Sequence, residues 1–260
     1  MGILIVLFLD ALMSLVFLLP LKDDRGPGKH FPLMTWLLIV INTVIHVVFT
    51  YVLPHVLGEE AWYKLMIYFV QIPGTIQEGS GLGAVSMITS AFLHANWSHL
   101  LSNMFYLFFF GRKVEDLLGP WKFVSFYLVC IFVSSIASVM SELASPLTHG
   151  WIMSLGASGA VMGLLGAYMF LYSEQRIQTL VMIILPIPVK IKLPTWVFML
   201  YMLLQNVSGA WLEQELQGMG LLYSQGIGFM AHLGGFVAGI VCTYFFLPGE
   251  ILSYRYRPHA

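Results

Sequence analysis

The chain has 260 residues, of which 58% are hydrophobic and 10% are charged, and its mean hydropathy is +0.83. Because a soluble domain carries about 25% charged residues, this composition excludes a soluble enzyme. The net charge of −1 leaves no basic field that would attract nucleic acid. The two cysteines, Cys130 and Cys242, lie in separate apolar runs and predict neither a disulfide framework nor a thiolate metal site. The sequence therefore predicts a protein whose solvent is a lipid bilayer.

Seven stretches are apolar and long enough to cross a bilayer, which requires roughly 20 residues in a helix. None of them alternates with period two, and backbone groups in lipid must be paired within the protein, so we expect an all-α polytopic bundle. The first stretch lacks a preceding Lys or Arg and is interpreted as a retained span, not as a cleaved signal peptide. The predicted spans are residues 2–20, 32–53, 90–111, 122–141, 157–173, 194–212 and 226–247.

The basic residues divide unequally between the two ends of these spans. Eleven of the 12 fall in loops at one end, and only Lys64 falls at the other. Loops rich in Lys and Arg remain in the cytoplasm, so the N-terminus is predicted outside and the C-terminus inside. Aromatic and polar residues interleave in the outer loop 54–89, which is expected to be partly helical at the interface. The inner segment 177–193 contains an apolar run broken by Pro186 and Pro188, and this run is also predicted to lie at the interface.

Three of the predicted spans carry polar groups in their first halves, and all three run from the outside inwards. At 1.5 Å per residue, Ser158, His232 and His99 are expected at roughly 3, 10 and 15 Å along their helices. A nucleophile, a base and oxyanion donors can therefore meet in the outer half of the bundle, as an acyl-transfer site requires. The motifs are His94-x4-His99-x3-Asn103, Gly156-x-Ser158-Gly159 and His232-x2-Gly235-x3-Gly239.

These residue types indicate a Ser–His dyad. A serine becomes nucleophilic when a neighbouring neutral imidazole removes its proton. Asn103, His99 and the backbone N–H of Ser158 can stabilise the developing oxyanion, and a helix N-terminus at Ser158 adds a positive dipole end. Because no Asp or Glu lies near the motifs at matching depth, His232 is expected to be positioned by packing.

Each motif also has a purely structural interpretation. Ser158 lies among glycines that favour close helix packing, and His232 alone is compatible with an interhelical hydrogen bond. His46, in the second span, is interpreted as a hydrogen-bonding residue of this kind. The three motifs together, at matched direction and depth, favour a functional site. The GxxxG pairs predicted to bring the fifth and seventh spans together are Gly159/Gly163 and Gly235/Gly239.

With these motifs, the sequence resembles the rhomboid family of intramembrane serine proteases over roughly residues 20–248. Gly111-x3-Glu115-x3-Gly119, at the inner end of the third span, is a further similarity. So is the run from Pro20-Leu21-Lys22-Asp23-Asp24 to Pro32-Leu33-Met34-Thr35-Trp36, which is typical of many bacterial members. The predicted organisation is an extra N-terminal helix and linker (1–30), a rhomboid protease core (31–248) and a cytoplasmic tail (249–260).

The resemblance implies a six-helix bundle around a water-accessible cavity, here preceded by one extra span, in a bacterial-type cytoplasmic membrane. It implies that Ser158 is the nucleophile, that His232 is the general base, and that His99 and Asn103 stabilise the oxyanion. The substrates implied are single-pass membrane proteins, cut within or just outside the bilayer. No cofactor, metal or nucleic acid is expected, and the oligomeric state stays open. Residues expected to support the site are His94, Gly156, Gly159 and Met162.

Two departures from the family pattern concern the surroundings of the site. Val85 and Ser86 stand where members often carry Trp-Arg, nine and eight residues before His94. Met162 stands where many members place an aromatic ring against the catalytic histidine, although a thioether can also contact imidazole.

Two other functional classes are compatible with parts of this sequence. A non-proteolytic rhomboid-like protein would bind membrane helices without cutting them, but such relatives typically lose the serine or the histidine, and both are present here. A haem-binding or transport protein would use His94, His99 and His232. No pair of histidines at comparable depth on two helices indicates haem ligation, and no acidic ion path is visible.

Overall fold

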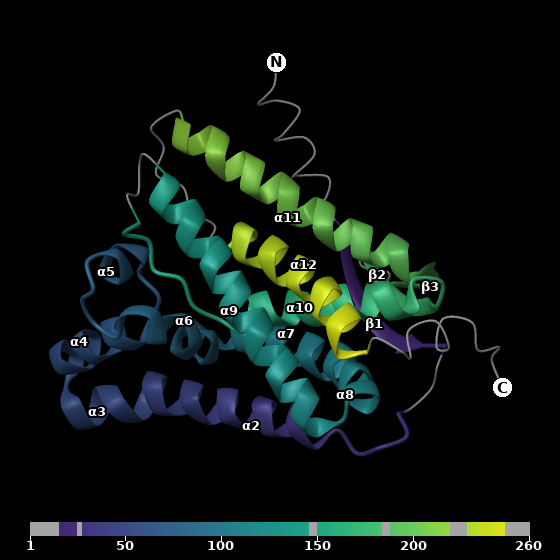
Figure 1. Cartoon of the computed structure of the whole chain (residues 1–260), viewed down its shortest axis with the longest axis horizontal. Coiled ribbons are helices and arrows are strands. Elements are labelled where there is room, and N and C mark those ends of the chain that lie inside the picture. Colours follow the sequence, from purple (N-terminus) through teal and green to yellow (C-terminus); the bar gives the residue numbers. More distant parts are fainter. Residues whose placement is uncertain (1–15, 25–27, 146–149, 184–187, 219–227, 248–260) are drawn as a thin grey trace.

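The computed structural model describes residues 16–24, 28–145, 150–183, 188–218 and 228–247. These ranges form a mostly helical bundle with one small sheet (Figure 1). Within these described ranges, three helical segments are long and apolar enough to cross a membrane: Leu33–Leu57, Pro120–Ala144 and Phe229–Phe246. The first of these combines α2 (Leu33–Val47), η1 (Val48–Val52) and α3 (Leu53–Leu57).

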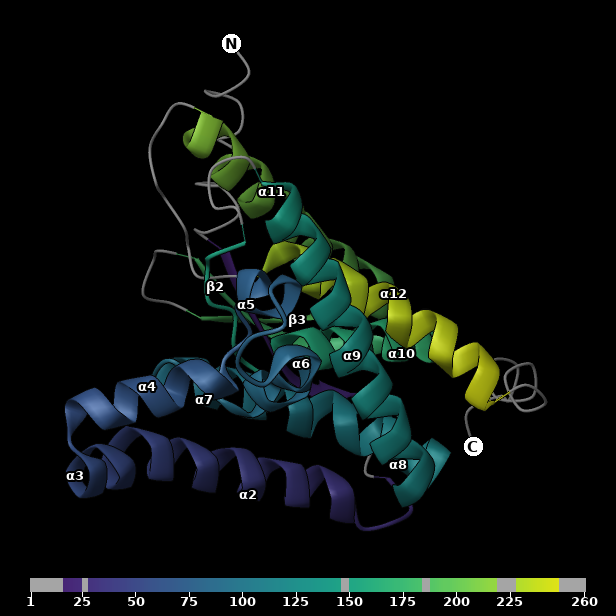
Figure 2. The same cartoon turned by 60° about the vertical axis from the view of Figure 1, so that its left-hand side comes forward.

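The remaining helices follow the predicted order. Short helices fill the segment expected to be an interfacial outer loop: α4 (Glu59–Phe69), α5 (Pro73–Gln77), η2 (Gly83–Val85), α6 (Ser86–Thr89) and η3 (Ser90–Phe92). The longer ones are α7 (Trp97–Tyr106) continued by η4 (Leu107–Gly111) and α8 (Arg112–Leu118), then α9 (Pro120–Ala144), α10 (Ser158–Tyr172), α11 (Thr195–Gly218) and α12 (Phe229–Phe246). Helices α2 and α11 lie at opposite edges of the bundle (Figures 1 and 2).

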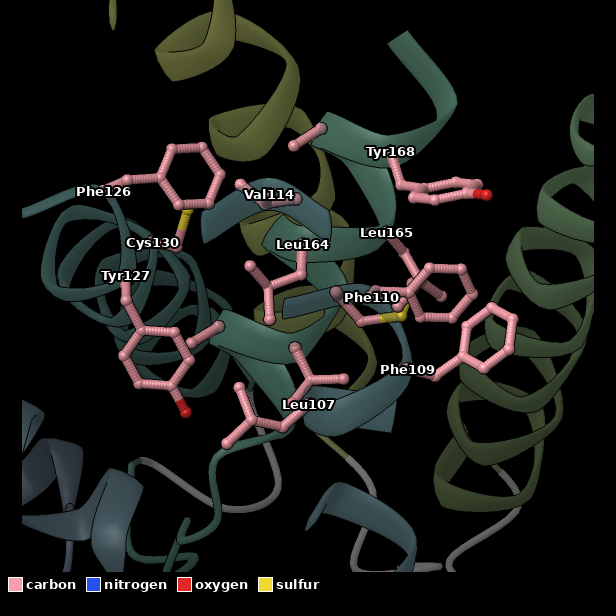
Figure 3. Close-up of a cluster of buried hydrophobic side chains, with 14 of the residues drawn as sticks. Leu107, Phe109, Phe110, Val114, Phe126, Tyr127, Cys130, Leu164, Leu165 and Tyr168 are labelled. Atoms are coloured by element: carbon pink, nitrogen blue, oxygen red, sulfur yellow. The ribbon is translucent and has the colours of Figure 1, made fainter. Parts of the chain in front are cut away.

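Helix α10 forms the centre of the bundle. Twelve of its 15 residues are buried, as expected for a helix that is apolar on all sides. Leu164 and Leu165 pack among aromatic and aliphatic side chains of η4 and α9 (Figure 3). Helix α12 approaches α10 backbone to backbone: a Cβ atom on Gly235 would lie 1.9 Å from the Gly159 carbonyl oxygen, and one on Gly239 would lie 1.9 Å from that of Gly163. Only glycine permits this spacing.

The carboxylate of Glu115 fixes the start of α2. It accepts hydrogen bonds from the backbone N–H of Met34 (2.8 Å) and of Thr35 (2.8 Å), and from the Thr35 hydroxyl (2.7 Å). Glu115 thereby supplies the N-terminal cap that the preceding Pro32 does not provide. Gly119, with φ +73°, makes the turn from α8 into α9. These contacts explain the spacing of the Gly111-x3-Glu115-x3-Gly119 motif.

A three-stranded antiparallel sheet corrects the all-α prediction. Its strands are β1 (Val16–Asp23), β2 (Arg176–Ile183) and β3 (Val189–Pro194), in that order. Residues 16–20, predicted to end the first membrane span, belong to β1; residues 2–15 and the predicted tail 249–260 lie outside the described ranges. Within the segment 177–193, residues 177–183 belong to β2 and residues 189–193 belong to β3. Strand pairing satisfies the backbone groups of β2 on both sides and those of β1 and β3 on one side each.

The buried carboxylate of Asp23 connects strand β1 to the helical bundle. Asp23 is 3% exposed, and its carboxylate accepts hydrogen bonds from Lys113 Nζ (3.1 Å) and from the Tyr168 hydroxyl (2.9 Å). These partners belong to α8 and α10, respectively. The predicted boundary at residue 31 therefore separates β1 from helices that it contacts directly.

Candidate active site

Ser158 is the first residue of α10 and is half-buried. Backbone hydrogen bonds hold the loop that precedes Ser158. The Gln71 N–H donates to the Ser154 carbonyl at 3.1 Å, and the Ser154 N–H donates to the Gln71 carbonyl at 2.8 Å. The Gly156 N–H donates to the Ser90 carbonyl at 2.9 Å. The loop that presents the Ser158 hydroxyl is therefore attached to the preceding outer segment at two points.

Gly156 brings this loop against two polar side chains of α7. Its φ is +116°, a conformation that residues with a Cβ rarely adopt. A Cβ atom there would lie 2.7 Å from Nε2 of His99 and 3.8 Å from Nδ2 of Asn103. The backbone two residues before Ser158 thus lies directly on the imidazole and the amide predicted to stabilise an oxyanion.

Helix α7 begins later than the sequence predicts. Asn96 caps it by accepting a hydrogen bond from the His99 N–H at 2.9 Å, so residues 90–96 form a short 3₁₀ turn and a loop. His99 is consequently the third residue of its helix, Ser158 the first and His232 the fourth. All three groups lie in the first turn of their helices, and the predicted depth of roughly 15 Å for His99 is wrong.

The amide of Asn103 has an unused donor. Asn103 is 5% exposed, and its Nδ2 atom has no hydrogen-bond partner in the part of the chain that the structure describes. Buried polar atoms are nearly always paired. This unpaired donor lies beside the loop that carries Ser158.

His232 is held by a residue that sequence reasoning missed. Its Nδ1 atom hydrogen-bonds Oδ1 of Asn206, on α11. The prediction that packing alone positions His232 is therefore wrong. Asn206 is a polar residue inside an apolar predicted span, which could have marked it, but its partner is 26 residues away on another helix and no local pattern links the two.

A cavity of about 710 Å³ adjoins Ser158. It is lined by Ser134 and other residues of α9, by Gly156, Ser158 and Gly159, and by Ala231 at the start of α12. A Cβ atom on Gly159 would lie 3.6 Å from the Ala231 carbonyl oxygen, so the chain neighbours of Ser158 and His232 approach each other closely. The site has space for a ligand beside the serine.

His94 and His46 form a ring cluster beside His99. The His94 ring lies 5.2 Å from that of His99 and 6.5 Å from that of His46, both edge to face. The centroid of the His46 ring also lies 4.9 Å from that of Trp97, so His46 contacts α7 through its ring. Its Nδ1 atom lies 3.5 Å from the Thr50 hydroxyl, one turn later in the same helical segment. No group of three or more His, Cys, Asp or Glu side chains in the described ranges is arranged to hold a metal ion.

The positions that depart from the family pattern have ordinary structural roles. Met162 is 5% exposed and belongs to the apolar core. Ser86 is buried and donates to the Gly83 carbonyl at 2.7 Å, which closes a turn, whereas Val85 is exposed.

Fold and site together define a helical membrane protein with a serine and two histidines in the first turns of three helices and an asparagine one turn further along α7. Residues 82–249, more than half of the chain, match the Rhomboid domain. The chain belongs to the rhomboid family.

Several curated relatives are similar to this chain. It is 34% identical over 143 residues to rhomboid-like protein 11, chloroplastic, of Arabidopsis thaliana (55% of this chain, 43% of the relative). It is 30% identical over 174 residues to rhomboid protein 1, mitochondrial, of Saccharomyces cerevisiae (66% of this chain, 45% of the relative). It is 35% identical over 85 residues to the protein named "putative rhomboid protease YdcA" of Bacillus subtilis (33% of this chain, 40% of the relative). The matched region is less than half the length of each of these relatives.

Proposed function

We propose that this protein is an intramembrane serine endopeptidase, in which Ser158 is the nucleophile and His232 the general base. The observation that carries the proposal is the contact of the Gly156–Ser158 loop with His99 and Asn103. This contact supports a nucleophile beside two donors, one of which is the unpaired amide of Asn103. Family membership and the similarity to a protein named as a rhomboid protease support the same reaction class.

In the proposed reaction, His232 removes the proton from the Ser158 hydroxyl as its oxygen attacks the peptide carbonyl carbon. The electrons of the C=O bond move to the oxygen, and the Asn103 amide, His99 and the Ser158 N–H donate hydrogen bonds to it. His232 then gives its proton to the departing amine as the C–N bond breaks. Water, activated in the same way, releases the acyl group and restores the hydroxyl of Ser158.

The proposed substrates are single-pass membrane proteins, cut near the outer face. The polar groups at the starts of α7, α10 and α12 support a site near one end of the bundle. The distribution of basic residues supports the orientation with this end outside and the C-terminus inside.

Cleavage of a membrane-helix substrate in proteoliposomes tests the proposal. The parent should produce two fragments and Ser158→Ala should produce none. Ser125→Ala, at an exposed position of α9 outside the cavity lining, should retain the parent rate. Cleavage that persists in Ser158→Ala would overturn the nucleophile assignment. Substrate that is bound but not cut by the parent would support the non-proteolytic alternative instead.

A further inference from the structure

Asn206 makes two hydrogen bonds that together define how its amide is turned. Its Nδ2 donates to the Met202 carbonyl, one turn earlier in α11, at 2.8 Å. Its Oδ1 meets Nδ1 of His232 on α12. Turning the amide over would place its oxygen against the Met202 carbonyl oxygen, where neither atom carries a hydrogen. The contact with Met202 therefore fixes Oδ1 as the atom that faces His232.

The orientation of this amide determines the tautomer of His232. An amide oxygen only accepts, so the imidazole Nδ1 must carry the hydrogen. A neutral imidazole protonated on Nδ1 has its lone pair on Nε2, and a general base needs such a lone pair. The bond also restricts rotation of the ring about its χ angles.

A second contact holds α11 at the same place on α12. Gly209 lies three residues after Asn206, and Phe229 lies three residues before His232, so each pair shares a helix face. A Cβ atom on Gly209 would lie 2.3 Å from the Phe229 ring. The ring thus occupies the space of a side chain on α11, and the two helices meet closely one turn away from the Asn206–His232 bond.

We propose that Asn206 is a positioning residue for catalysis, which acts through its hydrogen bond to His232. Asn206 holds His232 in the tautomer and orientation that accept the serine proton. The neutral amide takes the place that a carboxylate holds in a Ser-His-Asp triad, without adding charge to the membrane-embedded site. This inference rests on the proposed function, because it assigns Asn206 a role in the same reaction.

Kinetics of Asn206→Ala separate positioning from simple packing. We expect kcat to fall about 10- to 100-fold with KM nearly unchanged, because the base spends less time in its reactive form. Asn206→Asp, whose carboxylate can also accept from Nδ1 although its second oxygen would face the Met202 carbonyl, should recover part of that loss. Ser208→Ala, which removes a hydroxyl bonded within α11 at 3.1 Å, is the matched control and should behave as the parent. An unchanged kcat in Asn206→Ala, or equal losses in the Ala and Asp variants, would overturn the proposal.

The tautomer can be measured without any peptidase activity. In protein labelled with ¹⁵N-histidine, the His232 resonances are assigned by their loss in His232→Gln. The parent should show a protonated Nδ1 and an unprotonated Nε2, Asn206→Ala should move population to the Nε2–H form, and Ser208→Ala should not. A parent ring protonated on Nε2 would contradict the inference. If Ser158→Ala remained active while the NMR result held, the proposed function would fail and the hydrogen-bond assignment would stand.

Discussion

At the scale of single residues, the candidate site depends on one side-chain donor, at Asn103, and on one missing side chain, at Gly156. Asn103 has a buried amide donor without a partner, and Gly156 leaves space for the His99 ring. Gly156 belongs to the loop that carries Ser158, Asn103 lies beside that loop, and neither belongs to the apolar core. Their substitution is therefore expected to change catalysis more than stability.

Asn103→Ala removes the unpaired donor. We expect kcat to fall about 10²–10³-fold, because the loss of one oxyanion-hole donor has this effect in serine proteases. Thermal unfolding should change little, since Nδ2 makes no hydrogen bond in the described part of the chain. Steady-state cleavage measures the effect, with Ser102→Ala, at an exposed position of the same helix, as the control. A variant with parental kcat would remove Asn103 from the oxyanion site.

Gly156→Ala adds one methyl group against the His99 ring. The positive φ strains any L-residue there, and the Cβ atom would overlap the imidazole. Displacement of the Ser158 loop should lower kcat about 10- to 100-fold. Gly79→Ala is the matched control, because Gly79 also has a positive φ (+68°) but no atom within 4 Å of its Cβ position. If the two variants lost the same activity, backbone strain alone would explain the effect.

At the scale of secondary-structure elements, the contact of α10 with α12 sets the distance between the two helices that carry Ser158 and His232. Glycines on both helices allow carbonyl oxygens to approach within 1.9 Å of a missing Cβ position. A backbone carbonyl cannot move aside as a flexible side chain can. The spacing of the helices is therefore sensitive to a single added methyl group.

Gly239→Ala should force α12 away from Gly163. We expect the free energy of unfolding to fall by about 1–3 kcal/mol, as in other overpacked cores. The midpoint of thermal unfolding in detergent measures this loss. Val237→Ala, at a half-exposed position of the same helix, should have a smaller effect. Equal midpoints for Gly239→Ala and the parent would mean that the helices can separate without cost.

At the scale of the whole molecule, the orientation in the membrane is a prediction from the basic residues. Glu60 on α4 and Lys192 on β3 are both exposed and are predicted on opposite sides. A membrane-impermeant maleimide added to intact cells should label Glu60→Cys and should label Lys192→Cys only after permeabilisation. Both native cysteines are buried, which limits background labelling. The reverse pattern would invert the orientation.

The parts of the fold that could be predicted are those encoded locally. Apolar runs near 20 residues predict helices around α2, α9 and α12, because lipid requires backbone bonds within one segment. The sheet was missed because β1 pairs with β2 across about 160 residues, a partnership that local periodicity does not contain. The residues of the candidate site were predicted from their types and spacing. The start of α7 at Trp97 was not predicted because it depends on the Asn96 cap. The Asn206–His232 bond was not predicted because it is a tertiary contact between two helices.

If Ser158 is an activated nucleophile, it should react covalently with a serine-directed probe. The protein in detergent is treated with a fluorophosphonate, and the modified peptide is identified by mass spectrometry. We expect one adduct, on Ser158, that is absent from Ser158→Ala and strongly reduced in His232→Ala. An unlabelled Ser158 in the folded parent, or labelling of Ser158 that is unaffected by His232→Ala, would contradict this expectation.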